Sequence, residues 1–273
     1  MTDVVLLRDE PLARHTALRV GGRCDALVLV HREQVLLETL GVASEWGPLH
    51  WLGHGTRTLI RDGGVAGVFV RLGTDFSTMD RTNGEVWTVG ASVPVPALLE
   101  ATRGACLSGV ECLAGVPGSF GAALAAEEDL ETVVQSVRFV HRGAIRHGTL
   151  EEARKGRASR LILGATLVLT PSTPGAVRDA MLAARAARLP PGSYWQAPRG
   201  GKLRRRIERS GLAGVRLRRA QVPESAPELV VNLGGASASD IQLLARSVRD
   251  RVKLHTGVTL EPRYRWQGRQ GSA

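Results

Sequence analysis

The chain has 273 residues, of which 43% are hydrophobic and 23% charged, and its formal net charge is +10. This apolar content suffices for a packed core, which excludes an intrinsically disordered chain, and no apolar run reaches the roughly 18 residues that a membrane-spanning helix requires. The positive charge fits an anionic partner, but aromatic residues make up only 4% of the chain. Few side chains can therefore stack on bases, and nucleic acid is not the expected partner.

The N-terminus and the cysteines bear on the location of the protein. Residues 1–8 lack the basic stretch and the cleavage site of a secretory signal, and we interpret them as a strand. Cys24, Cys106 and Cys112 form no Cys-x-x-Cys pattern, and an odd number of cysteines among small residues favours reduced thiols. We therefore expect a cytoplasmic protein, without a membrane contact and in monomeric form. The histidines have no metal-ligand spacing, so we expect no metal site.

Residues 1–60 predict a small βαβ-like lobe. A buried strand over 24–30 is followed by apolar residues at helical spacing over 33–40 and by a second strand over 49–52. Residues 61–170 predict a lobe richer in strands, with one helix over 96–104 that begins at a proline. The strands expected in this second lobe cover residues 65–72, 85–91, 133–140, 144–147 and 161–169.

Residues 171–273 predict a further domain. The stretch Pro171-Ser-Thr-Pro174 is the best candidate for a linker to it. The last of its helices starts at a capping signal, Ser237 with Asp240 three residues later. The fold class is thus α+β, with two lobes over 1–60 and 61–170 and a C-terminal α+β domain over 171–273. Its expected helices cover 175–188, 201–210 and 237–255, and its expected strands cover 229–233 and 258–266.

Two glycine-rich loops carry the strongest chemical signal. The first glycine loop is Gly53-His-Gly-Thr56, and the second is residues 113–121, where glycine recurs at every third position from Gly115 to Gly121. Glycine lets backbone N–H groups approach a ligand without a Cβ in the way, which suits a pyrophosphate. Two such loops predict one diphosphate cofactor held from both sides. Turn formation explains the second loop alone equally well.

These segments, in this order, resemble the UDP-N-acetylenolpyruvoylglucosamine reductases, also called UDP-N-acetylmuramate dehydrogenases, over about residues 15–268. The resemblance implies an FAD-binding region in two parts followed by a substrate domain. It implies an oxidoreductase of peptidoglycan and cell-wall precursor synthesis, a flavoprotein that passes a hydride from NADPH through FAD to the enolpyruvyl carbon of a UDP-sugar. The matching stretches are His15-Thr-Ala-Leu-Arg-Val-Gly-Gly22, Leu52-Gly-His-Gly-Thr56, Asp62-Gly-Gly-Val-Ala-Gly-Val68, residues 107–118, Gly192-Ser193, Gly211-Leu-Ala-Gly214, Val230-Val-Asn232 and Gly257-Val-Thr-Leu-Glu-Pro262.

The resemblance also implies roles for single residues. Ser193 aligns with the serine that protonates the carbon next to the hydride acceptor, and Arg157 aligns with the arginine that stabilises the intervening enolate. From the residues alone, a turn hydroxyl is the favoured interpretation of Ser193, and a solvated arginine explains Arg157 equally well. Tyr194, Gln196 and Asn232 are implied to contact the substrate, although Asn232 is explained equally well as a strand-end residue that satisfies nearby backbone groups. The residues assigned to the cofactor are Gly53, His54, Gly55, Thr56, Arg57, Gly115, Val116, Pro117, Gly118, Ser119 and Gly121.

Several positions depart from the family pattern. Arg263, in Leu260-Glu-Pro-Arg263, stands where the family has its catalytic glutamate, and we expect the nearby Glu261 to face away. Gln196 and Ala197 replace a lysine and an asparagine, Arg57 replaces an asparagine, and the segment after Gly121 is short and acidic. These changes leave open an alternative: a paralogue that has lost or changed the chemistry and binds FAD, a UDP-sugar or a protein partner.

A second alternative is an anion- or nucleic-acid-binding protein that uses the basic region 202–219. Lys202, Arg205, Arg206 and Arg209 share one face of the expected helix over 201–210. A solvated helix face explains the same pattern without any ligand.

Overall fold

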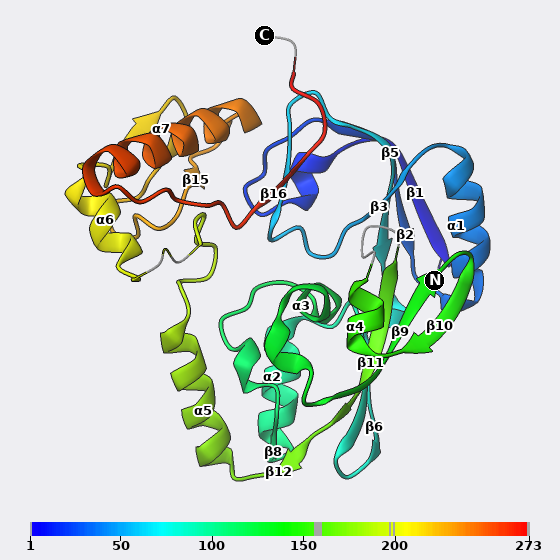
Figure 1. Cartoon of the computed structure of the whole chain (residues 1–273). Coiled ribbons are helices and arrows are strands. Elements are labelled where there is room, and N and C mark those ends of the chain that lie inside the picture. The colour runs from blue at the N-terminus through cyan, green and yellow to red at the C-terminus, as the bar shows by residue number, and fades with distance from the viewer. Residues whose placement is uncertain (1, 156–159, 197, 199, 272–273) are drawn as a thin grey trace. The chain divides into compact units, whose positions relative to one another are not determined.

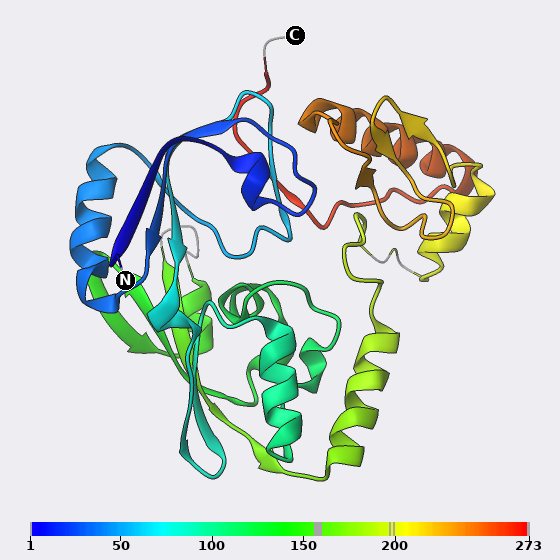
Figure 2. The same cartoon turned by 180° about the vertical axis from the view of Figure 1, so that it is seen from behind.

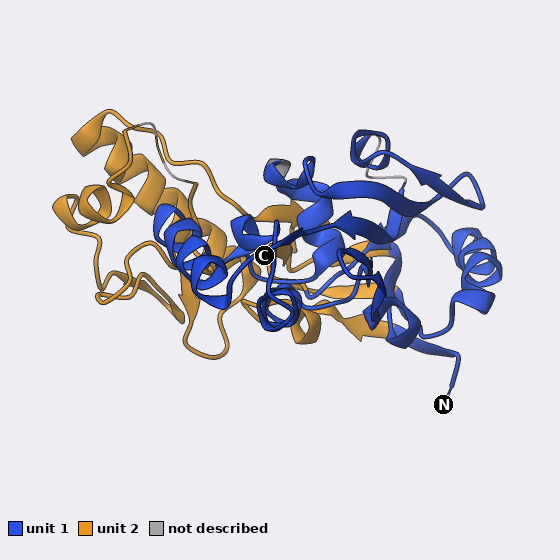
Figure 3. Ribbon diagram, turned by 90° about the horizontal axis from the view of Figure 1, so that it is seen from below, with its two compact units in different colours: residues 1–8, 26–54, 67–188 blue, residues 9–25, 55–66, 189–273 orange. Residues whose placement is uncertain are grey.

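The computed structural model describes residues 2–155, 160–196, 198 and 200–271 and is a mixture of helices and strands (Figures 1 and 2). The chain divides into two compact units (Figure 3). Unit 1 comprises residues 1–8, 26–54 and 67–188, and unit 2 comprises residues 9–25, 55–66 and 189–273. This division rests on compactness alone, so the three-part functional division at residues 60 and 170 stays a prediction.

The first sheet has the strand order β1-β2-β5-β3, and β5 pairs in parallel with β3. Three of the five boundaries between the units fall inside β1, β2 and β5. Helix α1 lies beside this sheet (Figures 1 and 2). It buries Leu36, Leu40 and Ala43 in a cluster with apolar residues of the sheet. The elements are β1 (Val4–Pro11), η1 (Leu12–His15), β2 (Arg23–Val30), η2 (Glu33–Val35), α1 (Leu36–Glu45), β3 (Leu49–Trp51) and β5 (Val65–Leu72).

The second sheet of unit 1 is antiparallel, with the strand order β10-β9-β11-β7-β6. Its apolar residues form a core with α2, α3 and α4 that includes Val89, Leu98, Phe120, Val137 and Leu167. The strands are β6 (Met79–Asn83), β7 (Val86–Gly90), β9 (Val134–His141), β10 (Ala144–Gly148) and β11 (Leu161–Val168). The helices of this part are η3 (Thr74–Ser77), α2 (Val95–Gly104), η4 (Glu111–Leu113), α3 (Phe120–Ala126), η5 (Glu128–Leu130), α4 (Leu150–Arg154) and α5 (Pro174–Ala187).

The proposed linker has a regular structure. Thr170 and Pro171 form β12, which pairs with β8 (Leu107–Ser108), and α5 begins at Pro174 with Thr173 as its cap. Proline suits this first helical position because its missing N–H has no partner in the first turn. Helix α5 belongs to unit 1.

Unit 2 is built around α7, whose capping signal is confirmed. The Ser237 side chain accepts a hydrogen bond from the Asp240 N–H, and the Asp240 carboxylate accepts one from the Ser237 N–H. The buried face of α7 packs with Tyr194 and Trp195 in one apolar cluster. The elements are β4 (Thr58–Ile60), α6 (Leu203–Arg209), β13 (Arg216–Leu217), β14 (Ala220–Gln221), β15 (Val231–Asn232), α7 (Ala238–Thr256) and β16 (Arg265–Gln267).

The expected last strand, 258–266, is the clearest error at the level of elements. Only Arg265–Gln267 forms a strand, which pairs in parallel with β4. Pro262 has no N–H to donate to a ladder, which limits regular pairing before it. Among the described residues, no helix combines the length and the apolar character needed to cross a membrane.

The three cysteines are free, as expected for reduced thiols. Burial raises the pKa of Cys24 and that of Cys112 to about 11, so both are neutral thiols near pH 7.

Candidate active site

The two glycine loops meet within unit 1. A Cβ placed on Gly53 would lie 2.9 Å from the Ser119 Oγ, and Ser119 is only 4% exposed. The absence of a side chain at Gly53 therefore permits this approach of the first loop to the second. Gly53 and Ser119, both assigned to a cofactor from the sequence, are neighbours.

Backbone hydrogen bonds hold the second loop against the segment before α2. The Val95 N–H donates to the Gly118 carbonyl (3.0 Å), and the Phe120 N–H donates to the Val93 carbonyl (2.8 Å). Gly118 has a φ of +109°, a conformation that favours glycine. At Gly121, an added Cβ would lie 2.7 Å from the Ala91 Cβ, so glycine is needed there for packing. The loop has a defined path with amides of fixed direction.

His54 lies in an environment that keeps its ring neutral. Burial is the main cause, and the positive charge of Arg71 is the second; together they hold the pKa of His54 below 6.5. A hydrogen bond with the Ser92 backbone acts in the opposite direction. A neutral imidazole can donate one hydrogen bond and accept another.

The end of the first glycine loop, Gly55 and Thr56, belongs to unit 2, where backbone hydrogen bonds hold it in place. The Ala17 N–H donates to the Gly55 carbonyl (3.1 Å), and a Cβ on Gly55 would collide with the His15 carbonyl. The Arg57 carbonyl accepts from the Arg265 N–H at 2.9 Å. The cofactor roles predicted for Gly55, Thr56 and Arg57 stay predictions.

Asp62, in a stretch that matches the family, caps α7. Its two carboxylate oxygens accept from the Ala238 N–H (2.7 Å) and the Ser239 N–H (2.8 Å), and one also accepts from the Ser239 hydroxyl (2.6 Å). A carboxylate also interacts favourably with the positive end of the helix dipole. The first amides of α7 are therefore satisfied from within unit 2.

The stretch that carries Ser193 lies beside the stretch that carries Arg263. Trp195 and Pro262 form an antiparallel bridge. The Gln196 N–H donates to the Glu261 carbonyl (2.7 Å), and the Arg263 N–H donates to the Tyr194 carbonyl (2.8 Å). Two of the segments to which the resemblance assigns chemistry are thus joined by backbone pairing.

Our expectation that Glu261 faces away from position 263 stays a prediction. Glu261 and Arg263 flank the bridged Pro262, but the backbone bends at Arg263, so the alternation of a regular strand does not fix their relative direction. Glu261 is exposed and Arg263 is half-buried. The segment therefore carries an exposed carboxylate two residues before the position of the family glutamate.

Ser193 itself is buried in a turn. Its hydroxyl donates to the Pro190 carbonyl (2.7 Å), and its N–H donates to the same oxygen (3.0 Å). Tyr194 is also buried, which raises its pKa to about 12, and its ring stacks on Tyr264. Gln196, in contrast, is exposed, and its amide donates to the Pro262 carbonyl (3.3 Å).

The amide of Asn232 is already engaged. Its nitrogen donates to the carbonyls of Leu18 (3.0 Å) and Arg19 (3.3 Å), and its oxygen accepts from the N–H groups of Gly234 (2.8 Å) and Ala236 (3.0 Å). These bonds fit the structural role that the sequence left open. A substrate contact stays a prediction and would add to them.

The acidic segment after Gly121 is fixed by two arginines. Arg188 donates to the Glu127 carboxylate (2.8 Å) and to the Cys112 carbonyl, and Arg154 donates to the Leu124 and Glu127 carbonyls. The ion pair with Arg188 gives Glu127 a structural role within unit 1. Arg157 and Ala197 lie outside the described residues.

Two buried carboxylates were missed by sequence reasoning. Glu111 accepts from the Gly109 N–H (2.7 Å) through one oxygen, and its other oxygen is buried with no hydrogen-bond partner in the described part of the chain. Glu228, 6% exposed, likewise has one unpartnered buried oxygen. In the sequence, both glutamates stand next to apolar residues, and this position was the signal that their side chains could be buried. The described residues hold no group of three or more His, Cys, Asp or Glu side chains suited to a metal ion.

Comparison with known proteins identifies the family. The family description "UDP-N-acetylenolpyruvoylglucosamine reductase, C-terminal domain" matches residues 187–266. A UDP-N-acetylenolpyruvoylglucosamine reductase of Geobacter metallireducens is 35% identical over 285 residues, which cover 97% of this chain and 95% of that protein. The chain belongs to the UDP-N-acetylenolpyruvoylglucosamine reductase family. Another reductase of this family, from Rubrobacter xylanophilus, is 35% identical over 95% of this chain and 94% of its own.

A solved structure supports the same conclusion for the fold. The UDP-N-acetylenolpyruvylglucosamine reductase of Thermus caldophilus is 26% identical and has a TM-score of 0.78, over 97% of this chain and 99% of that one. The α+β fold class is thereby confirmed for both the N-terminal region and the C-terminal domain. The matched C-terminal region of the reductase family contains Ser193, Asn232 and Arg263.

Proposed function

We propose that this protein reduces the enolpyruvyl group of a UDP-sugar with NADPH as the reductant and FAD as the bound cofactor. A hydride adds to the terminal enolpyruvyl carbon and a proton adds to its neighbour, so the carbon–carbon double bond becomes a single bond while NADPH is oxidised. Family membership over nearly the whole chain supports this reaction. The proposal also includes the monomeric, cytoplasmic form expected from the sequence.

The observation that carries the proposal is the meeting of the two glycine loops at Gly53 and Ser119. A Cβ on Gly53 would fill the space beside Ser119, and the second loop has its backbone fixed by the segment before α2. A glycine-rich loop whose backbone is held in place fits the diphosphate of FAD. Within unit 1, Gly53, His54 and residues 115–121 would hold the cofactor. When bound, FAD supplies the hydride that it has accepted from NADPH.

The remaining steps fall to side chains of this chain. Ser193 gives its proton to the substrate carbon. For this step its hydroxyl must break the hydrogen bond to the Pro190 carbonyl and turn to the substrate. Arg157 supplies the positive charge that stabilises the enolate. Glu261 supplies the carboxylate in place of the family glutamate, because it is exposed and lies two residues before Arg263.

The test is an absorbance spectrum of the purified protein. We expect a flavin spectrum that NADPH bleaches and that the enolpyruvyl UDP-sugar then restores. A protein that is colourless and does not take up added FAD contradicts the cofactor assignment. A flavin that NADPH bleaches but the UDP-sugar does not restore contradicts the substrate assignment.

A second candidate is a paralogue without this chemistry, and Arg263 is the observation that favours it. A guanidinium cannot replace a carboxylate in accepting a hydrogen bond or orienting a cation. This candidate predicts binding of FAD or the UDP-sugar, measured by calorimetry, with no turnover of NADPH in the presence of both.

A further inference from the structure

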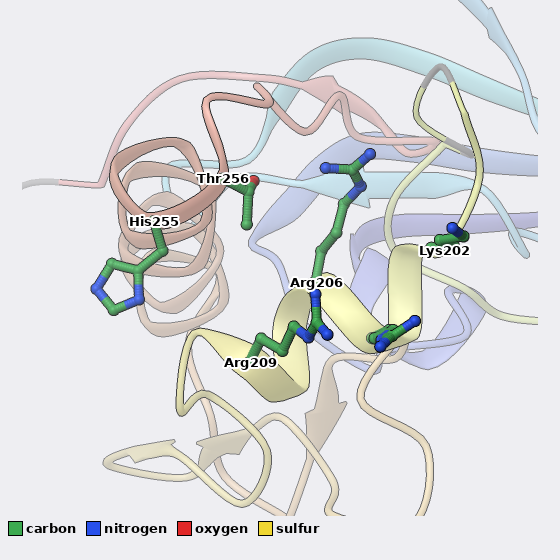
Figure 4. Close-up of a pocket in the computed structure, with 6 residues that line it drawn as sticks. Lys202, Arg206, Arg209, His255 and Thr256 are labelled. Carbon is green, nitrogen blue, oxygen red and sulfur yellow. The ribbon is translucent and has the colours of Figure 1, made fainter.

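A basic pocket of about 500 Å³ lies between α6 and α7 in unit 2 (Figure 4). Helix α6 contributes the cationic side chains, and the end of α7 contributes Thr256 on the other side, as Figure 4 shows. Among the described residues, no carboxylate lines it. The lining residues are Lys202, Arg205, Arg206, Arg209, His255 and Thr256.

The sequence of α6 explains why its charges gather there. Leu203 and Ile207, one turn apart, are 2% and 0% exposed and fix one side of the helix in the core. Glu208, the only acid on α6, pairs with Arg204 at 2.8 Å on another side. The face of α6 that points away from the core therefore carries the other basic side chains, and no acidic residue of the helix pairs with them.

These cations differ from several arginines elsewhere in the protein, which have a counterion. Arg154, Arg188 and Arg218 each pair with a carboxylate. Within the described ranges, no ion pair involves Lys202, Arg205, Arg206 or Arg209, although Arg206 donates to the Gly201 carbonyl (3.3 Å). The carbonyl end of α7 offers only about half a negative charge to this cluster. Like charges held this close together favour a bound anion.

We propose that this pocket binds a small polyphosphate anion, with a chain of two or more phosphate groups. Guanidinium groups bind phosphate oxygens through paired N–H donors, and several of them around one cavity match several phosphates. The volume is within the range of about 300–1,000 Å³ typical of small-ligand sites. In the part of the chain that the structure describes, no aromatic side chain lines the cavity, which disfavours a nucleic acid held by base stacking. Free inorganic polyphosphate and the phosphate chain of a nucleotide share this chemistry.

The test is calorimetric titration of the whole protein with tripolyphosphate at low salt. We expect saturable binding of one equivalent that weakens as salt is added. The double variant Arg205→Gln/Arg209→Gln should bind about tenfold more weakly or worse, because each lost guanidinium removes charge-assisted hydrogen bonds. The control variant Arg146→Gln/Arg246→Gln removes the same charge at two exposed positions outside the pocket and should bind nearly as the original protein does.

The proposal is overturned by no binding at low salt, by binding of many equivalents, by an equal loss in both variants, or by tighter binding of a single-stranded oligonucleotide than of tripolyphosphate. A parallel titration with ATP distinguishes the sources. Equal affinity assigns recognition to the phosphates alone, and higher affinity assigns part of it to the nucleoside; both support the site. The KM for the UDP-sugar should be unchanged in the Arg205→Gln/Arg209→Gln variant. A large rise in this KM would mean that the diphosphate of the substrate binds in the pocket, which would contradict a site separate from the substrate site.

Discussion

Gly53 approaches Ser119 so closely that a methyl group on Gly53 would lie 2.9 Å from the serine oxygen. Ser119 is 4% exposed, so this close approach lies in the interior of unit 1. The junction between the two glycine loops thus depends on a hydrogen atom at position 53. It is also the contact through which a change in one loop displaces the other.

The first prediction concerns this contact. Gly53→Ala should weaken FAD binding about tenfold through overpacking, with a small loss of stability. FAD content and affinity measure the effect, and Gly84→Ala, where an added Cβ meets nothing within 4 Å, is the control. In a Ser119→Ala background the same substitution should cost much less, because the clashing oxygen is gone. An equal loss in both backgrounds contradicts the steric explanation.

The second prediction concerns His54. Arg71→Gln removes a positive charge and should raise the pKa of His54 toward 6.5, as followed by NMR titration of the imidazole. Because the unfolded chain titrates near 6.5 and the folded chain below it, the stability contribution is complete above pH 6.5 and is lost as the pH falls through the folded pKa. Arg71→Gln should reduce that acid-side loss. An unchanged titration would remove Arg71 as a cause.

The third prediction separates the two roles of Ser193. Ser193→Ala should lower turnover of the UDP-sugar by about 10²-fold or more, while NADPH still bleaches the flavin at its original rate, because the proton is needed only in the second half of the reaction. Ser210→Ala is the matched control, since the Ser210 hydroxyl is also buried and bonded to a backbone carbonyl (2.9 Å). Equal turnover in the two variants would assign Ser193 to the turn alone.

The fourth prediction concerns the carboxylate beside Arg263. Glu261→Gln should lower kcat for the UDP-sugar with little change in the free energy of unfolding, because Glu261 is exposed. Arg263→Glu restores the family residue and should then rescue turnover in the Glu261→Gln protein. Full activity of Glu261→Gln would show that the reaction needs no carboxylate from this segment.

The fifth prediction concerns the cap of α7. Asp62→Ala leaves the Ala238 and Ser239 amides without their acceptor and should lower the free energy of unfolding by about 1–2 kcal/mol. Asp250→Ala, which removes an exposed ion pair with Arg249 on the same helix, should cost less than about 1 kcal/mol. Urea denaturation measures both. Similar losses would argue against a capping role.

Local signals in the sequence predicted local structure well. The pairing of Ser237 with Asp240 located the start of α7, and Pro96 located the start of α2. The spacing of the basic residues also predicted that they share one face of α6. What the sequence did not predict were partners distant along the chain: Asp62 as the acceptor for Ser239, and Leu18 as the acceptor for Asn232. Such contacts depend on tertiary packing, which no periodicity or turn signal encodes.

Contacts between residues distant along the chain also limited the prediction of the candidate site. The two glycine loops were recognisable from composition, but their contact through Ser119 required coordinates. The alternation of side chains in a strand does not decide the direction of Glu261, because the backbone bends at Arg263. The pocket at α6 needed Thr256, a residue without any signal of its own.

Unit 2 is assembled from three separated stretches of the chain, which has a consequence during synthesis on the ribosome. Residues 9–25 and 55–66 emerge early, yet Val20 and Leu59 pack in a cluster whose other members follow residue 189. These early stretches must wait for nearly the whole polypeptide before they can be buried. A gene fragment that encodes residues 189–273 alone would yield α7 without Asp62 and a core with two vacant positions, so we expect it to be degraded rather than to accumulate.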